Sequence, residues 1–563
     1  MSTLDTDVIV IGAGPVGLTL ANLLGVQGQR ALVLEVRSEL IDYPRAVGLD
    51  DESVRTLTAA DLWDRVEPYT VPHHAVRLVN GRGQVLALND PKLEELGTCR
   101  KHGFNQPVID QQLAAGLSRF AENEVRFSHR VVDIVDHGDH VAVTAERLDS
   151  DGAVLDRVTL TGRYAVGCEG GSSFTRKWMG VDFEGKSPAT RWVVLDIAND
   201  PIGAPNVYLG ADPRRPYVSM GLPQGVRRFE FMLHDDEPSE LVDDKAFMSS
   251  LLKQFLPEPE SIEVINQRVF THHGRIATSF RKGRVFLAGD AAHLMPVWLG
   301  QGWNSGMRDA TNLAWKLTTV LRGDADDRLL DSYTEERHKH ALDMIEVNMA
   351  AGAVMKMKPL GGWVRDRAAA ALNVVPTWKS YFTELRFKPM PRYASGVVVD
   401  QVSLRPGSAA ASFKESTSLL PFVDSPGGVS PVGLQFIQPR VTTAELADVL
   451  LDRVVGHWWA IAAWNVNPTH FMSADDLAFC ERHGIRLFSF VPEVQREWAE
   501  KHVANSPAHV TVVGDSSEAL KRWFDTRACG AIILRPDHFV AAASFNQQLS
   551  RALRAIQKAG SMR

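Results

Sequence analysis

The stretch RVFLAGDAAHLMPVWLGQGWNSGMRDATNLAWKL, residues 284–317, decides the fold of this chain. It opens with an apolar run, residues 285–288, that is typical of a buried strand. It closes with the helical spacing of Met307, Leu313 and Leu317. The stretch therefore predicts a strand that leads into a helix, as in an open α/β sheet.

Polar and glycine residues fill the turn between that predicted strand and helix. Gly289 and Asp290 put a carboxylate at the carboxyl end of the strand, while Gly300 and Gly302 leave backbone amides open at the start of the helix. Ligands of open α/β sheets bind at the carboxyl ends of strands, and helix N-termini favour negative charge. The pattern predicts a site for a sugar hydroxyl beside an electron-poor ring carbonyl. The alternative is a glycine-rich turn between core elements.

A second glycine motif lies near the N-terminus and consists of Gly12, Gly14, Pro15 and Gly17. It follows an apolar run, residues 8–11, and precedes a helical pattern. A second predicted strand, residues 31–34, ends in Glu35, which can bind ribose hydroxyls. Strand, turn, helix, strand and acid together are the fingerprint of dinucleotide binding, for NAD or FAD.

The two motifs resemble those of the single-component FAD-dependent aromatic hydroxylases, whose second motif is matched here as G-D-x-x-H-x-x-x-P-x-x-G-x-G-x-N-x-G-x-x-D-x-x-N-L. The resemblance implies a non-covalently bound FAD, with Asp290 on the ribityl chain and Pro296 beside the flavin ring. The residues that it assigns to FAD binding are Gly12, Gly14, Pro15, Gly17, Glu35, Arg45, Gln106, Glu169, Gly289, Asp290, Pro296, Gly300, Gly302 and Asn304.

Three of these assignments rest on further segments that resemble the family. Arg45 lies in a loop that the family places near the FAD phosphates or the flavin edge, the alternative being a solvated surface arginine. Gln106 matches a residue in the second helix through which members of the family contact FAD. Glu169 stands where the family motif D-G-x-x-S-x-x-R has an aspartate, while Arg176 matches its arginine. That motif serves FAD and NAD(P)H together, so the resemblance implies NADH or NADPH as co-substrate.

Residues 192–270 alternate apolar and polar positions in short runs, which predicts an antiparallel sheet. The resemblance implies that this sheet is inserted between the two FAD-binding halves as a roof for the substrate. In this roof Arg215 is predicted to anchor a carboxylate and Tyr217 to hydrogen-bond a phenol, with Tyr208 or His272 as alternatives to Tyr217. The competing interpretation makes Arg215 a rim residue and Tyr217 a core residue. The residues predicted to act in catalysis are Arg215, Tyr217, His272 and Pro296.

Less generic runs, such as residues 40–46 and 295–298, extend the resemblance over nearly the whole chain. The resemblance implies O2-dependent ortho-hydroxylation of a phenol with a carboxylate side chain, with 3-(3-hydroxyphenyl)propionate giving 2,3-dihydroxyphenylpropionate in aromatic catabolism. The alternatives are hydroxylation of another phenol, of the resorcinol or polyketide type, a flavin dehydrogenase, or an FAD-binding redox sensor.

The C-terminal part follows a stretch rich in Ser, Pro and Gly, residues 395–432, which is predicted to be a linker. The β/α pattern beyond it resembles the thioredoxin-like domain of larger family members, but it has no C-x-x-C, which favours a packing or homodimerisation role over redox chemistry. The predicted fold is therefore α/β, a Rossmann-like FAD-binding domain with an inserted sheet and a thioredoxin-like domain. The predicted boundaries are 1–185 and 276–394 for FAD binding, 186–275 for the substrate sheet, 395–432 for the linker and 433–563 for the last domain.

Composition limits the partners of this chain. Its net charge of -7 argues against nucleic acid, and no apolar run reaches the roughly 18 residues that cross a bilayer. No signal-peptide pattern precedes the first predicted strand. The four cysteines are scattered, which argues against a thiolate metal site and is typical of a reducing compartment. We expect a cytoplasmic enzyme without a metal.

Overall fold

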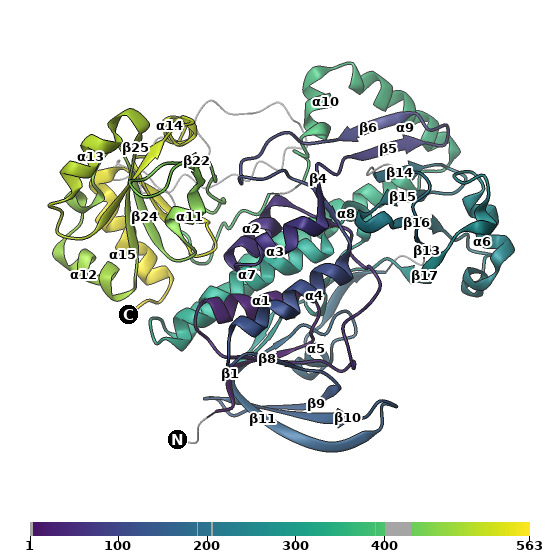
Figure 1. Ribbon diagram of the computed structural model, residues 1–563, viewed down its shortest axis with the longest axis horizontal. Coiled ribbons are helices and arrows are strands. Elements are labelled where there is room, and N and C mark those ends of the chain that lie inside the picture. The colour runs from purple at the N-terminus through teal and green to yellow at the C-terminus, as the bar shows by residue number, and fades with distance from the viewer. Residues whose placement is uncertain (1–3, 188–189, 204–206, 389, 400–429, 528) are drawn as a thin grey trace. The chain divides into compact units, whose positions relative to one another are not determined.

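A computed structural model describes residues 4–187, 190–203, 207–388, 390–399, 430–527 and 529–563 (Figure 1). These residues form two compact units. The first comprises residues 1–93, 99–311 and 341–389, and the second comprises residues 94–98, 312–340 and 390–563. Most of the predicted linker, residues 400–429, lies outside the described residues.

The first unit is built on a sheet whose central strands are parallel. Its strand order is β19-β20-β11-β1-β2-β8, and β10 and β9 extend it from β11. The strands are β1 (Thr6–Ile11), β2 (Ala31–Leu34), β8 (Glu124–Arg126), β9 (His129–Asp136), β10 (Val141–Leu148), β11 (Val154–Gly167), β19 (Arg281–Lys282) and β20 (Val285–Leu287). All three residues of β20 are fully buried, as the apolar run predicts.

Helices cover this sheet and begin where its strands end. The helix α1 (Pro15–Val26) follows β1 and α7 (Gly302–Leu321) follows β20, so both predicted strand-to-helix passages are present. Thr19 of α1 hydrogen-bonds Met307 of α7, so the two helices lie side by side (Figure 1). The other helices of this part are α2 (Asp51–Ala59), α3 (Trp63–Val66), α4 (Gln106–Gly116) and α5 (Phe174–Met179).

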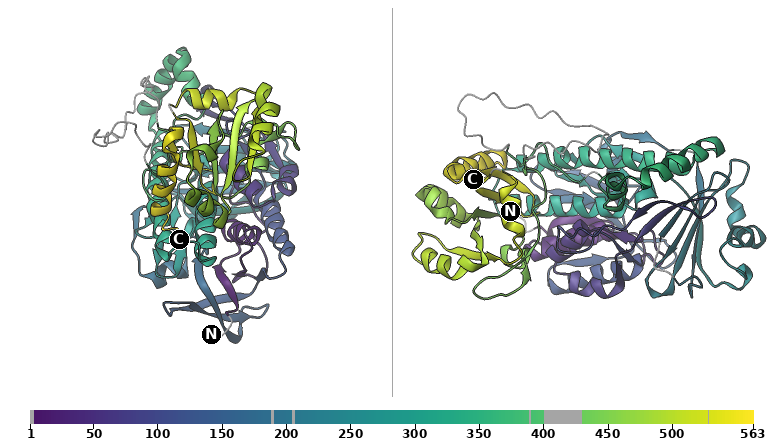
Figure 2. Two further views of the ribbon diagram at one scale, coloured as in Figure 1. Left: turned by 90° about the vertical axis from the view of Figure 1, so that its left-hand side faces the viewer. Right: turned by 90° about the horizontal axis from the view of Figure 1, so that it is seen from above.

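A second, mostly antiparallel sheet in the first unit has seven strands in the order β17-β13-β16-β15-β14-β5-β6. They are β5 (Val76–Asn80), β6 (Val85–Asn89), β13 (Arg191–Ile197), β14 (Val207–Ala211), β15 (Tyr217–Gly221), β16 (Arg227–Met232) and β17 (Val264–Thr271). Residues 76–89 thus join the sheet that the sequence predicts from residues 192–270 alone. One face packs against α6 (Lys245–Leu252) through buried Val193, Leu195, Phe229 and Phe231 (Figures 1 and 2).

The second unit contains a five-stranded mixed sheet in the order β26-β25-β24-β27-β28. The strands are β24 (Ala460–Trp464), β25 (Arg486–Pro492), β26 (Val510–Asp515), β27 (Ala531–Leu534) and β28 (Val540–Ser544), and the helices are α11 (Leu451–Val455), α12 (Ala474–Arg482), α13 (Arg496–Val503), α14 (Ala519–Asp525) and α15 (Leu549–Ala559). Its core holds a buried ion cluster in which Arg535 donates to both oxygens of Glu336 at 2.8 Å, and Lys316 donates to Glu336 at 2.8 Å.

The remaining elements are small sheets and further helices. The short strands are β3 (Gly48–Leu49), β4 (Thr70–Pro72), β7 (His102–Phe104), β12 (Phe183–Lys186), β18 (Gly274–Ala277), β21 (His293–Leu294), β22 (Arg440–Val441) and β23 (Val449–Leu450), and the helices are α8 (Ser332–Met355), α9 (Pro359–Asn373) and α10 (Pro376–Thr383). Among the described residues no helix combines the length and the apolar character that crossing a bilayer requires.

Candidate active site

The turn between β1 and α1 has the form that a dinucleotide phosphate needs. Gly12 has φ +108°, and a Cβ there would lie 2.6 Å from the Cys168 carbonyl oxygen. A Cβ on Gly14 would meet nothing within 4 Å, so that side of the turn is open at the helix N-terminus. Glu35 accepts hydrogen bonds from the Ala13 amide at 2.8 Å and the Arg37 amide at 3.0 Å. The turn is therefore held by Glu35 and open where a pyrophosphate would bind.

Asp290 lies on a second held turn, after β20. The Gly289 amide donates to Asp309 Oδ2 at 2.9 Å, and His293 Nε2 donates to the same oxygen at 2.7 Å. Asp290 itself is exposed, yet desolvation by the surrounding protein raises the pKa of its carboxyl. Asp290 therefore offers an accessible carboxylate on a turn that Asp309 holds in place. A ribityl hydroxyl would find a fixed acceptor here.

Arg45 and Gln106, both predicted to bind FAD, are in direct contact. Gln106 Oε1 accepts from the backbone amides of Arg45 at 3.2 Å and Ala46 at 2.7 Å, and Gln106 Nε2 donates to Asp110 at 2.9 Å. Burial raises the pKa of Asp110 to about 7. The exposed Arg45 guanidinium opposes the rise in the pKa of both Asp110 and Asp290, so its positive charge lies near both carboxyls.

The Glu169 side chain is hydrogen-bonded to the start of the helix that follows it, α5. It accepts from Ser173 Oγ at 2.7 Å and from the Thr175 amide at 2.9 Å at the start of α5. Arg176 of this helix donates to the Ala291 carbonyl at 3.0 Å, which ties α5 to the Asp290 turn. The structure thus gives Glu169 a local structural role, while its part in handling NAD(P)H stays a prediction.

The loop from Pro296 to α7 ends at an open helix N-terminus. Gly300 has φ +63°, and a Cβ on Gly300 or Gly302 would meet nothing within 4 Å. The Asn304 side chain, by contrast, is used within the protein: it accepts from the Asp50 amide at 3.1 Å and donates to the Gly300 carbonyl at 2.8 Å. Its predicted role in FAD binding would therefore be to hold the loop. The two open glycine turns and the accessible Asp290 carboxylate fit an FAD molecule.

The two faces of the seven-stranded sheet separate the residues predicted to bind substrate. Tyr217 packs with the α6 side, where its ring lies 4.9 Å from that of Phe255, and Tyr208 faces the same way by register. Arg215 is paired with both oxygens of Glu237, at 2.6 and 2.8 Å. This packing argues against substrate contacts by Arg215 and Tyr217.

The opposite face, here called the inner face, carries Trp192 and Asp196 of β13 together with Arg228, Glu230 and Met232 of β16. His272 joins it, with its ring stacked on Trp192 at 5.5 Å and against Trp298 at 4.7 Å. Burial lowers the pKa of His272 to about 3, so the ring is neutral. Of the residues predicted in the roof, His272 is the one that the structure brings to the Pro296 loop.

Several residues of the site escaped the sequence analysis. Asp309 and His293, both fully buried, fix the Asp290 turn; their positions in the family motif were the available signal. Arg308 donates to Asp50 and to Glu52, the latter at 2.7 Å, and joins α7 to α2 through a buried ion cluster. Nothing in the sequence pairs these charges, because they lie more than 250 positions apart.

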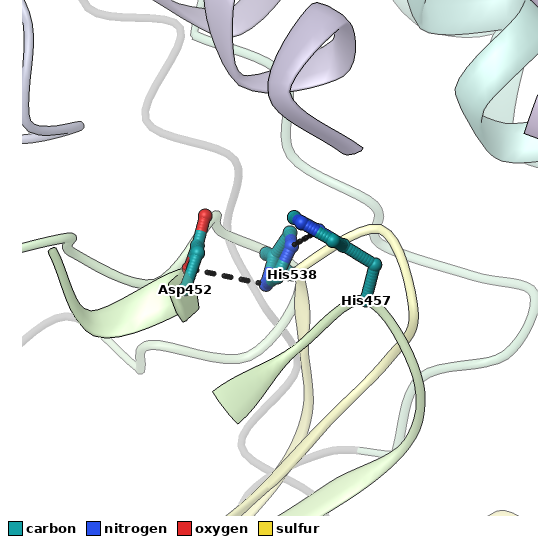
Figure 3. Close-up of side chains that lie close together, drawn as sticks. All are labelled: Asp452, His457 and His538. Carbon is teal, nitrogen blue, oxygen red and sulfur yellow. Dashed lines mark hydrogen bonds and ion pairs between the residues drawn. The ribbon is translucent and has the colours of Figure 1, made fainter. Parts of the chain in front are cut away.

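A separate polar cluster lies in the second unit and consists of Asp452, His457 and His538 (Figure 3). His538 Nε2 lies 2.8 Å from His457 Nδ1, and His538 Nδ1 lies 3.4 Å from Asp452 Oδ1. Both nitrogens of His538 therefore have protein partners, which is the pattern of a hydrogen-bonded chain.

Comparison with known proteins agrees with this geometry. A family described as FAD binding domain matches residues 5–348, and one described as HcaD C-terminal domain matches residues 433–559. The chain is 47% identical over 545 residues to a 3-(3-hydroxy-phenyl)propionate/3-hydroxycinnamic acid hydroxylase of Mycobacterium sp. (strain JLS), covering 97% of this chain and 90% of the relative. It is 43% identical to the protein of that name from Klebsiella pneumoniae subsp. pneumoniae, covering 98% and 94%.

Solved structures show the same fold. The flavin-dependent monooxygenase PieE, solved with FAD and substrate, superimposes with a TM-score of 0.79 at 18% identity over 99% of both chains. Aklavinone-11 hydroxylase, solved with FAD and aklavinone, gives 0.74 at 23% identity over 99% of this chain and 100% of that one. The chain belongs to the FAD-dependent aromatic hydroxylases, in the family of the 3-(3-hydroxy-phenyl)propionate/3-hydroxycinnamic acid hydroxylases.

Proposed function

We propose that this monooxygenase uses NADH or NADPH and O2 to hydroxylate 3-(3-hydroxyphenyl)propionate next to its hydroxyl group, giving 2,3-dihydroxyphenylpropionate. One observation carries the proposal: the identity of 43–47% to relatives named for this substrate runs along at least 89% of their length. It therefore covers both FAD motifs and the seven-stranded sheet. 3-Hydroxycinnamate, the second substrate in those names, has the same phenol and carboxylate on an unsaturated side chain.

The roles we propose for the FAD-site residues follow from the two open turns. The amides around Gly14 at the start of α1 would hold the pyrophosphate, and the Asp290 carboxylate would accept a ribityl hydroxyl. The amides at Gly300–Gly302 would stabilise negative charge at the pyrimidine edge of the flavin. When bound, FAD supplies the redox and oxygen chemistry, while the protein contributes binding, orientation and exclusion of water.

For the second unit we propose a thioredoxin-like domain that packs or dimerises, within boundaries at about 433 and 563. The mixed sheet supports this, because a parallel pair, β24 and β25, adjoins the antiparallel pair β27 and β28. Burial raises the pKa of the Cys480 and Cys529 thiols to about 12. Protonated thiols are poor nucleophiles, which supports a role without redox chemistry.

A substrate panel scored by product tests the proposed function. Purified holoenzyme is given NADH or NADPH, O2 and one of four compounds: 3-(3-hydroxyphenyl)propionate, 3-hydroxycinnamate, resorcinol or 3-phenylpropionate. We expect a catechol product from the first two, with O2 uptake matching the reductant consumed. Product from resorcinol alone would show that the substrate is another phenol and would contradict the proposed function. Reductant oxidation that no phenol stimulates, with no product, would favour a dehydrogenase or a redox sensor.

A further inference from the structure

Glu230 occupies the middle of the inner face. Side chains on one face of a strand recur every second residue, about 7 Å apart, so Arg228 and Met232 flank Glu230 along β16. Val194 and Val218 face it from the neighbouring strands. Glu230 is therefore the one acid of β16 on this face.

The two flanking residues show what Glu230 faces. Arg228 is bound by Asp196 at 2.7 and 3.0 Å and donates to the backbone carbonyls of Pro44 and Arg45. Met232, on the other side, belongs to the apolar cluster of Trp192 and Trp298. One neighbour thus contacts the Arg45 loop and the other lies toward the Pro296–Gly300 loop. Glu230 faces the interval between two segments that border the FAD site.

The Glu230 carboxyl has no hydrogen-bond partner among the described residues. Its side chain is 9% exposed, and the nearest cation, Arg228 Nη1, lies 4.0 Å from Oε1. Burial raises the pKa of Glu230; Asp196 adds to the rise, while Arg228 and Arg268 oppose it. A buried carboxylate without a donor is costly, because burial removed its hydrogen bonds to water. A ligand hydroxyl would supply the missing donor.

We propose that Glu230 accepts the hydrogen bond of the substrate phenol and takes up its proton during hydroxylation. This inference rests on the proposed function, since it requires a phenol in the site. The phenol O–H bond breaks and an O–H bond forms at Glu230 Oε, so the carboxylate becomes neutral and the phenol becomes a phenolate. The added electron density at the neighbouring ring carbon promotes attack by that carbon on the transferred oxygen.

Other acceptors in this part of the protein fit the role less well. The neutral His272 ring lies between aromatic rings and resists protonation, because burial lowers its pKa to about 3. Tyr217 is on the opposite face of the sheet. Asp196 is already bound by Arg228. Glu230 combines a carboxylate that accepts no hydrogen bond from the described residues with a place on the inner face.

The test compares Glu230→Gln with Glu146→Gln in FAD-loaded enzyme. Glu146 is a matched control, because its side chain is also 9% exposed but lies on β10, where Arg130 and Arg157 bind it. Reduced enzyme is mixed with O2 and 3-(3-hydroxyphenyl)propionate, and catechol and hydrogen peroxide are measured after one turnover between pH 6 and 10. Binding of 3-phenylpropionate, which has no phenol, is followed by the change in flavin absorbance.

We expect Glu230→Gln to lose about 10³-fold in hydroxylation rate at pH 7, because a phenol with a pKa of about 10 is ionised to one part in about 10³ there. The variant's rate should then rise about tenfold per pH unit toward pH 10, with peroxide released instead of catechol at neutral pH. Wild type and Glu146→Gln should be fastest above the pKa of Glu230 and lose rate as the carboxyl is protonated at lower pH. 3-Phenylpropionate should bind Glu230→Gln no more weakly than wild type, because the substitution removes no hydrogen bond to a ligand without a phenol and removes a negative charge near its carboxylate.

The possible results distinguish a wrong role for Glu230 from a wrong substrate class for the enzyme. A Glu230→Gln rate within threefold of wild type at pH 7 overturns the assignment, as does a loss that high pH does not restore. If Glu230→Gln fails to hold FAD, Glu230→Asp decides: a reduced rate without the tenfold rise per pH unit supports the role, and the rise contradicts it. Wild-type enzyme that hydroxylates no phenol overturns the proposed function instead.

Discussion

Asp309 offers a sharp test of how the protein holds the Asp290 turn. Asp309→Ala removes the acceptor of the Gly289 amide and of His293 Nε2, at 2.9 and 2.7 Å in a fully buried place. A hydrogen bond to a charged group contributes about 1.5–3 kcal/mol, so losing two should cost about 3–6 kcal/mol. A domain is stable by only about 5–15 kcal/mol, so the change is large.

Asp309→Asn separates charge from geometry. Both hydrogen bonds reach the same oxygen, Oδ2, and an amide oxygen in its place can accept both as neutral bonds. Neutral bonds contribute about 0.5–1.5 kcal/mol each, so we expect a loss of about 2–3 kcal/mol. FAD should bind both variants at least tenfold more weakly, because the turn that carries Asp290 is loosened.

Urea unfolding and FAD titration measure these effects. The transition of the first unit is identified as the one that added FAD shifts to higher urea, since a ligand stabilises the state that binds it. Asp139→Asn, an exposed carboxyl with 81% of its side chain accessible, serves as the control and should change stability by less than about 0.5 kcal/mol. An Asp309→Ala protein within 1 kcal/mol of wild type, at the same m-value and with FAD affinity within twofold, would refute the reasoning.

Three further predictions concern the FAD site and the second unit. Asp290→Ala should weaken FAD binding about 10- to 150-fold, the loss of one charged hydrogen bond, as measured by flavin fluorescence; unchanged flavin content would exclude the assigned role. Arg535→Met leaves Glu336 and Asp537 without their main cation and should destabilise by about 3–5 kcal/mol a urea transition that FAD does not shift. The charges of Arg535 and Lys316 lower the pKa of Glu336 to about 2, so its contribution of roughly 3 kcal/mol is present above pH 4.5 and is lost as pH falls from 4.5 to 2. Urea midpoints of wild type and Glu336→Gln at pH 3 and pH 6 would measure this difference.

The sequence by itself determined the parts of the site that local backbone chemistry defines. A glycine turn between a strand and a helix needs Gly12 with positive φ and leaves Gly14 open, whatever the rest of the chain does. The spacing to Glu35 fixes an acid at the end of the next parallel strand, where it holds the Ala13 amide. These contacts span few elements, so periodicity and motif are enough to predict them.

Register and long-range pairing were decided only by the tertiary structure. A shift of one residue moves a side chain to the other face of a sheet, and the sequence did not show that Tyr217 packs against α6 while Glu230 lies on the inner face. It also did not show that Arg215 pairs with Glu237, or that residues 76–89 complete the sheet. Such partners are chosen by packing between distant segments, and that choice leaves no local pattern.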